Sequence, residues 1–488
     1  MARVKRLFRK GELLEVEIID MAFGGKGIGK ITTDEGDFTL FVLNSLPGQL
    51  VQARITKCKN RYAEAKLELV LRPAKEQIEL QYQEIPGAPY ASLPIELQHA
   101  FKERTTLELY KRIGKLANIE EVYKGLIPSP TTWHYRNKME YSFAAIVHRL
   151  DTNEKSDEFG FGFKHRGTWW AVENLDRDSG LFDQQVEDHL ITIRNWCEES
   201  GLPAWHPPRR EGFFRFLVAR KSYATGKLLF NFVTSSAGLE KFDQQAFLEL
   251  MKSCFGDRLH GILHTVNDDT GDRVEARDGE STLIYGEEKL IESIGGLDFE
   301  MSMYSFFQTN PQSAERLYAA ALEAIGDSVG PDDVVLDLFC GTGTISQLVA
   351  RNYDCKVVGV DLIESAIEDA KANAIRNNIK GIKFFAEDAG KFLLNHPEYT
   401  GKLKTIVLDP PRAGISPKTL RKVIRLGAQR LVYISCNPAT QARDAALLKE
   451  SGYELEQLQL CDQFPHTSHV EAIAVFELRH YGQGLLEE

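Results

Sequence analysis

The sequence predicts a chain in three parts that ends in a doubly wound, Rossmann-like α/β domain. After residue 330, short segments rich in valine and isoleucine alternate with helical stretches, as in VVLDLF (334–339) and KVVGVD (356–361). Continuously apolar strands of this kind are typical of parallel sheets, which bind ligands beyond the carboxyl ends of their strands. We therefore expect an α/β domain over residues 291–488, with its site at those strand ends.

The first part, residues 1–72, has the pattern of a small β-barrel. Its alternating apolar segments are separated by the turn signals GGKGIGK, DEGD and PGQ. It holds 13 Lys and Arg against nine Asp and Glu, whereas the whole chain has a net charge of −11. A basic module on an acidic body is compatible with nucleic-acid binding through one face. The glycine-rich loop around Lys26 and Lys30 either approaches a polyanion closely or is a plain hairpin.

The middle part, residues 73–290, has a mixed pattern that predicts a central α+β domain. A helix is expected over residues 95–118, and strand-like stretches such as FRFLVARK and KLLFNFV follow it. We find no secretory signal and no apolar run long enough to span a membrane. The seven scattered cysteines include no C-x-x-C pair, which favours a reducing cytoplasm over disulfides or a zinc ribbon.

A nucleotide site is predicted at the first strand–helix turn of the α/β domain. Gly341 and Gly343 would let a nucleotide lie against the backbone. Asp361 follows Gly341 by 20 residues, at the tip of the next strand, where a carboxylate binds ribose hydroxyls. Ser346 stands at the third position of the G-x-G-x-x-G pattern, so a nucleoside cofactor without a pyrophosphate fits better than a dinucleotide. Asp388 ends the following strand, where it could accept from an adenine amino group.

Three further acidic or nucleophilic residues lie at later strand ends. Asp409 is followed by two prolines, which fix the exit of its strand, and by Arg412, which is available for a phosphate or carboxylate. Cys436 ends the strand RLVYIS; taken alone, such a cysteine is more often a buried small hydrophobe. Glu471 precedes the apolar run AIAVFEL. Upstream of it, HTSH has the H-x-x-H spacing, but no further ligand motif lies nearby and we expect no metal there.

Taken together, several motifs resemble those of the RNA uridine-5-methyltransferases, the 23S rRNA and tRNA 5-methyluridine enzymes. The motifs are FFQTNPQSAERLY, LDLFCGTGT, LDPPRAG, YISCNPAT and FPHTSHVE. The barrel resembles the TRAM domain that many rRNA members carry, and WHYRNKMEYSF is similar to their central domain. The combination of DPPR with SCNP separates the chain from RNA cytosine-5 methyltransferases, which often have a proline-cysteine after the aspartate. Adenine-N6 enzymes have an aromatic residue where this chain has Arg412.

The resemblance implies that Cys436 is the nucleophile, Glu471 the general base and S-adenosylmethionine the methyl donor. The positions that match the family's cofactor-binding residues are Gln308, Phe339, Thr344, Asp361, Asp388 and Asp409. Asp361 stands where glutamate is common, which shortens its reach to the ribose. The chemistry explains these residue types, because carbon 5 of uracil becomes nucleophilic only after a thiolate adds to carbon 6. The proton on carbon 5 must afterwards be removed by a positioned base.

We therefore expect methylation of carbon 5 of a uridine in RNA. The barrel favours rRNA as the substrate, tRNA is the alternative, and a catalytically silent RNA-binding or ribosome-assembly factor is the alternative from another class. Many rRNA members also carry four cysteines for an iron–sulfur cluster, but residues 86–101 and 172–180 contain none, so we expect no cluster. The protein is expected to be a cytoplasmic monomer that binds RNA and no membrane.

Overall fold

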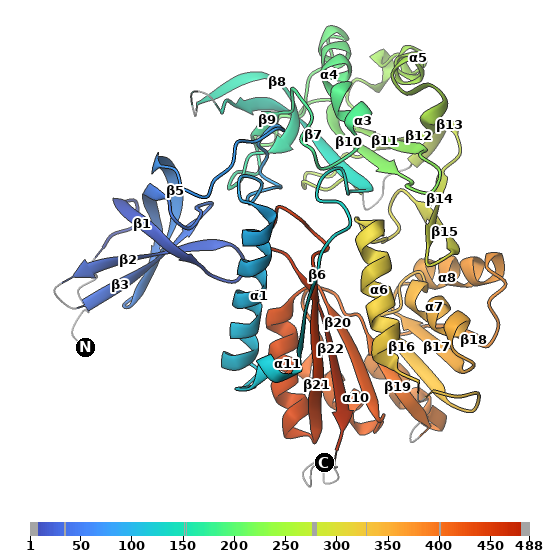
Figure 1. Ribbon diagram of the computed structural model, residues 1–488. Coiled ribbons are helices and arrows are strands. Elements are labelled where there is room, and N and C mark those ends of the chain that lie inside the picture. The colour runs from blue at the N-terminus through green and yellow to red at the C-terminus, as the bar shows by residue number, and fades with distance from the viewer. Residues whose placement is uncertain are drawn as a thin grey trace.

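The chain forms a small barrel, a central domain and an α/β domain, which lie around one long helix (Figure 1). The barrel lies to one side, the central domain lies above the α/β domain, and α1 (Ile95–Arg112) runs between the barrel and the α/β domain. This arrangement confirms the predicted fold class. The computed structural model describes residues 8–33, 36–150, 152, 154–275, 281–327, 329–399 and 402–479.

The N-terminal barrel is closed by five strands in the order β1-β2-β3-β5-β4. Their bounds are β1 (Leu13–Met21), β2 (Lys26–Thr33), β3 (Gly36–Leu43), β4 (Leu50–Cys58) and β5 (Tyr62–Arg72). Alternate side chains fill its interior, as on β3, where Phe38, Leu40 and Val42 are buried and the residues between them are partly exposed. Closure leaves this small module without a free strand edge.

The central domain is built on a seven-stranded sheet in the order β13-β12-β11-β10-β7-β8-β9. The bounds are β7 (Lys138–His148), β8 (Lys155–Lys164), β9 (Val172–Asn174), β10 (Phe214–Lys221), β11 (Leu228–Thr234), β12 (Leu259–Val266), β13 (Ser281–Gly286), α3 (Gln184–Asp188), α4 (Leu190–Glu199) and α5 (Gln244–Phe255). The three helices cover one face of the sheet over a phenylalanine-rich core (Figure 1). The other face meets the α/β domain, because Val218 of β10 packs in one cluster with Leu290 and Val335.

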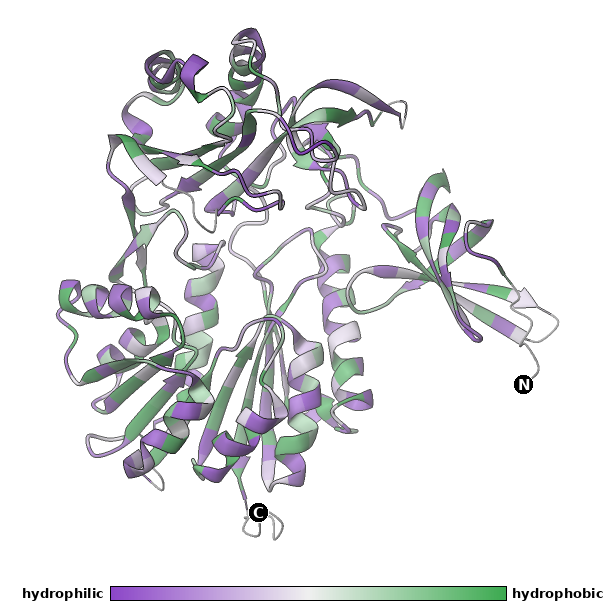
Figure 2. Cartoon of the chain, turned by 180° about the vertical axis from the view of Figure 1, so that it is seen from behind, coloured by the Kyte–Doolittle hydropathy of each residue, from purple (hydrophilic) through white to green (hydrophobic). Residues whose placement is uncertain are grey.

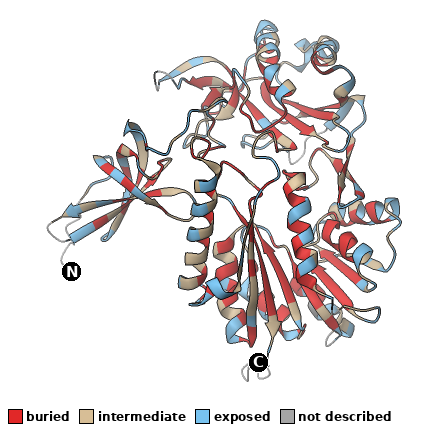
Figure 3. Ribbon diagram, viewed as in Figure 1, coloured by how far each residue is buried: buried red, intermediate tan, exposed pale blue. Residues whose placement is uncertain are grey.

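The α/β domain contains an eight-stranded sheet in the order β18-β17-β16-β19-β20-β22-β21-β6. Its strands are β6 (Tyr123–Ile127), β16 (Val334–Leu338), β17 (Lys356–Asp361), β18 (Ile382–Ala386), β19 (Leu403–Leu408), β20 (Arg430–Ser435), β21 (Tyr453–Cys461) and β22 (Glu471–Leu478). Its helices are α6 (Pro311–Ile325), α7 (Thr344–Asn352), α8 (Glu364–Arg376), α9 (Ala389–Asn395), α10 (Pro417–Arg425) and α11 (Pro438–Glu450). The central strands are apolar (Figure 2) and buried (Figure 3), as both faces of the sheet are covered.

The structure divides the chain differently from the predicted boundaries. Residues 95–127, which we assigned to the central domain, provide α1, the short α2 (Ile119–Val122) and β6. These elements belong to the α/β domain, because β6 pairs with β21 and Tyr110 of α1 donates a hydrogen bond to Gln441 of α11. The boundary expected after residue 290 falls inside the hairpin of β14 (Lys289–Ile294) and β15 (Leu297–Ser302). Periodicity predicts the elements but does not show which sheet an edge strand joins. None of the helices in the described ranges is long and apolar enough to cross a membrane.

Candidate active site

The pairing of β20 with β22 brings Cys436 and Glu471 together. The two strands are antiparallel, and Ser435 lies opposite Ala472. Cys436 follows Ser435 and Glu471 precedes Ala472, so the thiol and the carboxylate stand across from each other at the same edge of the sheet. Asp409 follows β19, the parallel neighbour of β20, and reaches this edge as well.

The three groups at this edge hold their protons more tightly than usual. Burial raises the pKa of the Cys436 thiol to about 11; the charges of Glu471 and Asp409 act in the same direction and Arg412 opposes them. Burial, with a contribution from Asp409, raises the pKa of Glu471 to about 8, again against the effect of Arg412. Burial raises the pKa of Asp409 to about 7. In the free protein at pH 7 the thiol is therefore protonated. The pKa of Glu471 lies within about one unit of this pH.

The two loops beside Cys436 are tied to each other. Asn437 donates a side-chain hydrogen bond of 3.0 Å to the backbone carbonyl of Arg412, and its own N–H donates to the Ser435 hydroxyl at 3.1 Å. Pro438 then begins α11. The Asn-Pro pair thus ends the strand, starts the helix and holds the exposed Arg412 loop close to the thiol.

The turn after β16 has positive φ angles, which glycine adopts more easily than other residues. Phe339, Gly341 and Gly343 have φ of 68°, 54° and 76°. A Cβ on Gly343 would lie 2.7 Å from the ring of Phe384, so only glycine fits there. At Gly341, by contrast, none of the described atoms lies within 4 Å of the Cβ position, and the backbone faces open space. This space lies beside the buried Thr344 at the start of α7, at a strand–helix turn of the kind that binds nucleotides in doubly wound folds.

Asp361 supports this turn as well as facing it. One carboxylate oxygen accepts from Gly341 N–H at 3.0 Å and the other accepts from Ile363 N–H at 2.9 Å. Each oxygen keeps a further lone pair, which can accept from a ribose hydroxyl. Asp388 has a different local role, because it is exposed and caps α9 by accepting from Lys391 N–H at 3.0 Å.

Gln308 lies in the buried segment before α6. Its backbone carbonyl accepts from the Asn137 side chain of the central domain at 3.0 Å, and its side chain hydrogen-bonds to Tyr318 of α6. Burial, together with the nearby charge of Asp409, raises the pKa of Tyr318. Gln308 and Asp409, far apart in the sequence, therefore both affect the Tyr318 phenol, Gln308 through a hydrogen bond and Asp409 through its charge.

Two residues of this site were missed by the sequence analysis, Asp337 and Tyr318. Asp337 is fully buried in the middle of β16, and burial raises its pKa to about 7. It accepts from the Ser346 hydroxyl, while its Oδ1 has no hydrogen-bond partner among the described residues. An acid inside the apolar run VVLDLF is rarely buried without a reason and could have been noticed. Tyr318 carries no such signal, because tyrosine on a helix is ordinary.

The loop that leads into Glu471 is held by a buried ion pair. Asp462 accepts from Lys102 of α1 at 2.7 Å and contacts His99 at 2.9 Å, and both partners of the lysine pair are buried. Lys102 also donates to the Phe464 carbonyl at 3.0 Å. Burial opposes ionisation of Asp462, but Lys102 and His99 outweigh it and hold its pKa below the usual value.

Further along this loop, the two histidines of HTSH have separate environments. The ring of His466 stacks on Trp133 at 3.7 Å, and its Nδ1 contacts the Gln98 side chain at 3.1 Å. Burial lowers the pKa of His469 to about 4, and the positive charge of Arg412 acts in the same direction. Among the described residues, no group of three or more His, Cys, Asp or Glu side chains is arranged to hold a metal ion.

The barrel also touches this loop, through its glycine-rich turn. Gly25, with φ of 82°, lies so close that an added Cβ would be 3.0 Å from both Ser468 Cβ and the Tyr90 hydroxyl. Met21 and Leu46 of the barrel pack with Tyr90 and Leu93 in one buried cluster. The glycine turn is therefore a docking element as well as a hairpin.

The fold and the open turn beside Gly341 define a class, the S-adenosylmethionine-dependent methyltransferases. A family model described as tRNA (Uracil-5-)-methyltransferase matches residues 285–479, and a TRAM domain model matches residues 8–67. The chain is 36% identical to an uncharacterized RNA methyltransferase of Clostridium acetobutylicum over 97% of this chain and 99% of the relative. A second uncharacterized RNA methyltransferase, from Clostridium tetani, is 36% identical over 95% and 97% of the two chains.

A solved structure extends this likeness to the whole chain. It is the Pyrococcus abyssi tRNA (uracil-54, C5)-methyltransferase in complex with S-adenosyl-L-homocysteine, with 25% identity, a TM-score of 0.70, and coverage of 95% of this chain and 100% of that one. The chain belongs to the RNA uracil-5 methyltransferase family and has an N-terminal TRAM domain. It is an S-adenosylmethionine-dependent RNA methyltransferase, which sets aside the alternative of a catalytically silent factor.

The charges around Cys436 predict opposite effects of two substitutions. At pH 8, a thiol with a pKa near 11 is ionised in about one molecule in a thousand. Glu471→Gln removes a negative neighbour and should lower the pKa of Cys436, whereas Arg412→Ala removes a positive one and should raise it. At pH 9, where Glu471 is ionised, iodoacetamide should therefore alkylate Cys436 roughly threefold to tenfold faster in the first variant and slower in the second.

Mass spectrometry of the Cys436 peptide measures these rates, with Cys436→Ala to assign the signal. Changes in the same direction in both folded variants would show that access to the thiol, and not charge, controls its reactivity.

The buried ion pair predicts a large loss of stability when Lys102 alone is removed. Lys102→Met leaves the buried Asp462 with only His99, which should cost roughly 3–5 kcal/mol in the urea unfolding of the α/β domain. Lys111→Met on the same helix is the control; Lys111 is paired with Glu120 on the surface and its loss should change stability by no more than about 1 kcal/mol. Because the pKa of Asp462 is lowered, this stabilisation should persist at neutral pH and disappear as the pH falls through that pKa. Equal effects of the two substitutions would contradict a structural role for the pair.

Proposed function

We propose that the enzyme methylates a uridine of 23S rRNA through a covalent adduct between Cys436 and the target uracil. The observation that carries this proposal is the position of Cys436 opposite Glu471 across β20 and β22, which puts a nucleophile and a base at one strand edge. The TRAM barrel, docked on the loop before Glu471, supports rRNA because many rRNA members carry this domain. A second candidate is tRNA, since the tRNA (uracil-54, C5)-methyltransferase of Pyrococcus abyssi aligns with 95% of this chain, barrel included.

The residues proposed to hold the cofactor surround the open turn after β16. Asp361 would bind the ribose, and the backbone from Phe339 to Thr344 would lie along the nucleoside. Gln308, Asp388 and Asp409 are proposed to complete the site. The bound S-adenosylmethionine supplies the methyl group.

Cys436 and Glu471 are proposed to act in sequence. The Cys436 thiol gives its proton to water, and the thiolate adds its sulfur to carbon 6 of the uracil, so that the electron pair of the 5,6 double bond makes carbon 5 nucleophilic. Arg412 favours the thiolate form. After carbon 5 has gained its methyl group, the Glu471 carboxylate takes the proton from that carbon. The double bond re-forms, the bond between sulfur and carbon 6 breaks, and the thiolate leaves. The raised pKa of Glu471 makes its carboxylate, once ionised, a stronger base for the carbon 5 proton than an ordinary glutamate.

This order predicts that Glu471→Gln arrests the reaction after methyl transfer. Glutamine keeps the shape but cannot take the carbon 5 proton. We expect a slow-migrating protein–RNA band on a denaturing gel that carries radiolabel from the methyl donor. The double variant Cys436→Ala/Glu471→Gln is the control and should give no band. Turnover like the wild type would assign the base to another group, and a folded, cofactor-bound variant without adduct would place Glu471 before methyl transfer.

The choice of RNA is tested by mapping 5-methyluridine in a strain that lacks the gene. Mass spectrometry should show the modification missing from one or more 23S rRNA uridines, with tRNA unchanged, and plasmid-borne wild type but not Cys436→Ala should restore it. Loss from tRNA alone would establish the second candidate instead.

We further propose that the enzyme has no iron–sulfur cluster, because the segments that carry cluster ligands in many rRNA members have no cysteine here. These parts of the chain are connected by ordinary contacts: the Gln83 side chain donates to Asn174 O at 2.7 Å and accepts from Asp176 N–H at 2.9 Å, and Ala88 packs in one buried cluster with Leu175. We also propose that the protein is a monomer and that it is cytoplasmic; the seven free cysteines support the second of these.

Protein purified without oxygen should accordingly be colourless and lack stoichiometric iron and acid-labile sulfide. The same preparation exposed to air should keep its absorption spectrum and activity. Iron and sulfide near four atoms per chain would contradict this prediction.

A further inference from the structure

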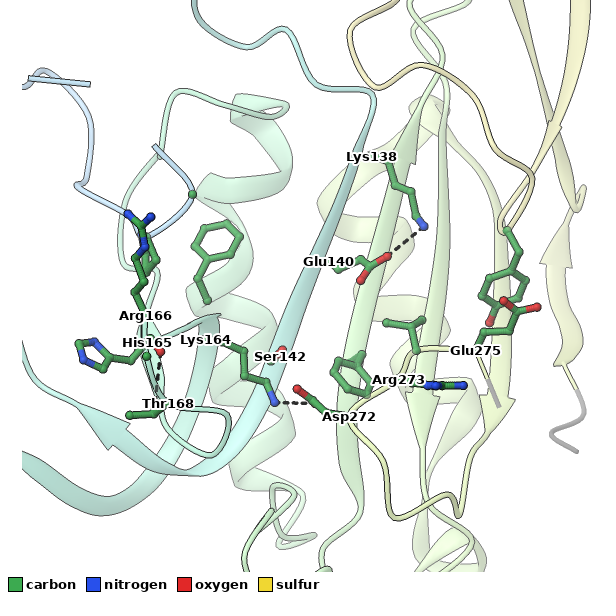
Figure 4. Close-up of a pocket in the computed structure, with 17 residues that line it drawn as sticks. Lys138, Glu140, Ser142, Lys164, His165, Arg166, Thr168, Asp272, Arg273 and Glu275 are labelled. Atoms are coloured by element: carbon green, nitrogen blue, oxygen red, sulfur yellow. Dashed lines mark hydrogen bonds and ion pairs between the residues drawn. The ribbon is translucent and has the colours of Figure 1, made fainter. Parts of the chain in front are cut away.

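A cavity of about 940 Å³ lies on the central domain, outside the site described above. One wall is β7, a second is the loop of residues 165–168, and a third is the segment of residues 272–275 with Tyr304. Figure 4 shows Arg166 on the loop side, Arg273 and Glu275 on the opposite side, and Lys138 and Glu140 between them. The volume exceeds what a single nucleotide needs, so a nucleotide and its flanking phosphate can enter.

The strand alternation explains why polar groups face this cavity. Lys138, Glu140 and Ser142 lie on one face of β7, while Met139 and Tyr141 between them are buried in the phenylalanine-rich core. The polar face is the one turned to the α/β domain. Arg220 of β10, paired with Lys138, shows this, because it donates to the Ser305 carbonyl at 2.9 Å. The cavity therefore opens beside the segment that leads to Gln308.

The cavity contains both satisfied and unpaired charges. Lys138 is paired with Glu140 at 2.9 Å, and Lys164 with Asp272 at 2.6 Å. Arg166 and Arg273 make no ion pair with any of the residues described. Arg166 is also half-buried, which lowers its pKa, and a guanidinium in such a place is stabilised by an anion.

Arg166 connects the cavity with the catalytic edge. Its positive charge contributes to the lowered pKa of His469, as does that of Arg412, the arginine next to Cys436. Pro86 and Gly87 also line the cavity, and Tyr90, three residues further on, donates its N–H to the His466 carbonyl at 2.9 Å. This end of the cavity therefore lies near the loop that leads into Glu471.

The uncharged part of the lining is aromatic. Phe163, Phe216 and Tyr304 line the cavity, and rings of this kind stack with nucleobases of any sequence. Glu140 and Glu275 can accept only, so they favour bases with an exocyclic amino group, namely adenine, guanine and cytosine, over uracil, whose only donor on the base is N3–H. The cavity is lined by acidic as well as basic side chains, whereas a groove that binds only the phosphate backbone is lined by basic ones.

We propose that this cavity binds an unpaired nucleotide of the RNA substrate that flanks the modified uridine, with its phosphate on Arg166 and an amino-bearing base among the aromatic rings. The proposal rests on the proposed function, since it takes the modified uridine to be at Cys436. It assigns to the central domain a direct part in the choice of the RNA site.

The test compares Arg166→Ala with Arg166→Lys and with the charge-matched control Arg421→Ala, on an exposed position of α10. The probe is the transcript that the wild type methylates, whether rRNA or tRNA. Arg166→Ala should lower kcat/KM by about tenfold, mainly through KM, and reduce the salt slope of RNA binding by about one. Arg166→Lys should recover most of this loss, and Arg421→Ala should behave like the wild type. Cofactor affinity and melting temperature should be unchanged in all three.

A second measurement locates the nucleotide. Photo-crosslinking of transcripts with 6-thioguanosine, which keeps an exocyclic amino group, at single flanking positions should label peptides that contain residues 163–168 or Tyr304 from one position only, and Arg166→Ala should abolish that label. A transcript without the base at this position should have a higher KM than the intact transcript with the wild type. With Arg166→Ala, the two transcripts should have the same KM.

Wild-type behaviour of folded Arg166→Ala, or labels confined to other peptides, would overturn the cavity assignment while leaving the proposed function intact. Methylation that survives Cys436→Ala would overturn the proposed function, and the Arg166 comparison would still report on the cavity.

Discussion

Ser435 of β20 lies opposite Ala472 of β22, and the rest of the site depends on this register. In a sheet of parallel strands alone, each strand delivers its last residue to the same edge, and any second group must come from another strand end. The antiparallel β22 delivers its first residue there instead. A shift by one residue would turn Glu471 to the other face of the sheet and separate its carboxylate from the thiol.

This register requires the loop that leads into β22 to be held in place. Residues far away in the sequence hold it. Lys102 of α1 is buried against Asp462, Gln98 of the same helix contacts His466, and Tyr135, which precedes β7, donates to the Pro465 carbonyl at 3.0 Å. The loop before Glu471 makes hydrogen bonds of its own through Thr467, and these side chains from other parts of the chain hold it in place as well. This explains why α1 and β6 precede the central domain in sequence yet lie against the α/β sheet.

Much of the site follows from the sequence because strand ends are easy to recognise. The apolar runs place Asp361, Asp409 and Cys436 at one edge of a parallel sheet, and the structure brings the last two together with Glu471. Residues such as Tyr318 and Arg166 could not be found in this way, because they lie on a helix and a loop whose positions are set by tertiary packing. The same holds for α1 and β6, whose amphipathic patterns fit either domain. Asp388 shows a second limit of the sequence pattern, because an acidic residue at the end of a strand can also be the N-cap of the helix that follows.

The contact between Gly25 and Ser468 has a consequence for how this protein can change over time. Two segments separated by more than 400 positions share a space too small for one extra methyl group on either side. A side chain at position 25 would crowd positions 468 and 90 and would also have to adopt a positive φ, so a smaller neighbour alone would not make room for it. A barrel can dock on this loop in the same way only if it presents a glycine at this turn. One residue without a side chain therefore couples the barrel to the methyltransferase domain.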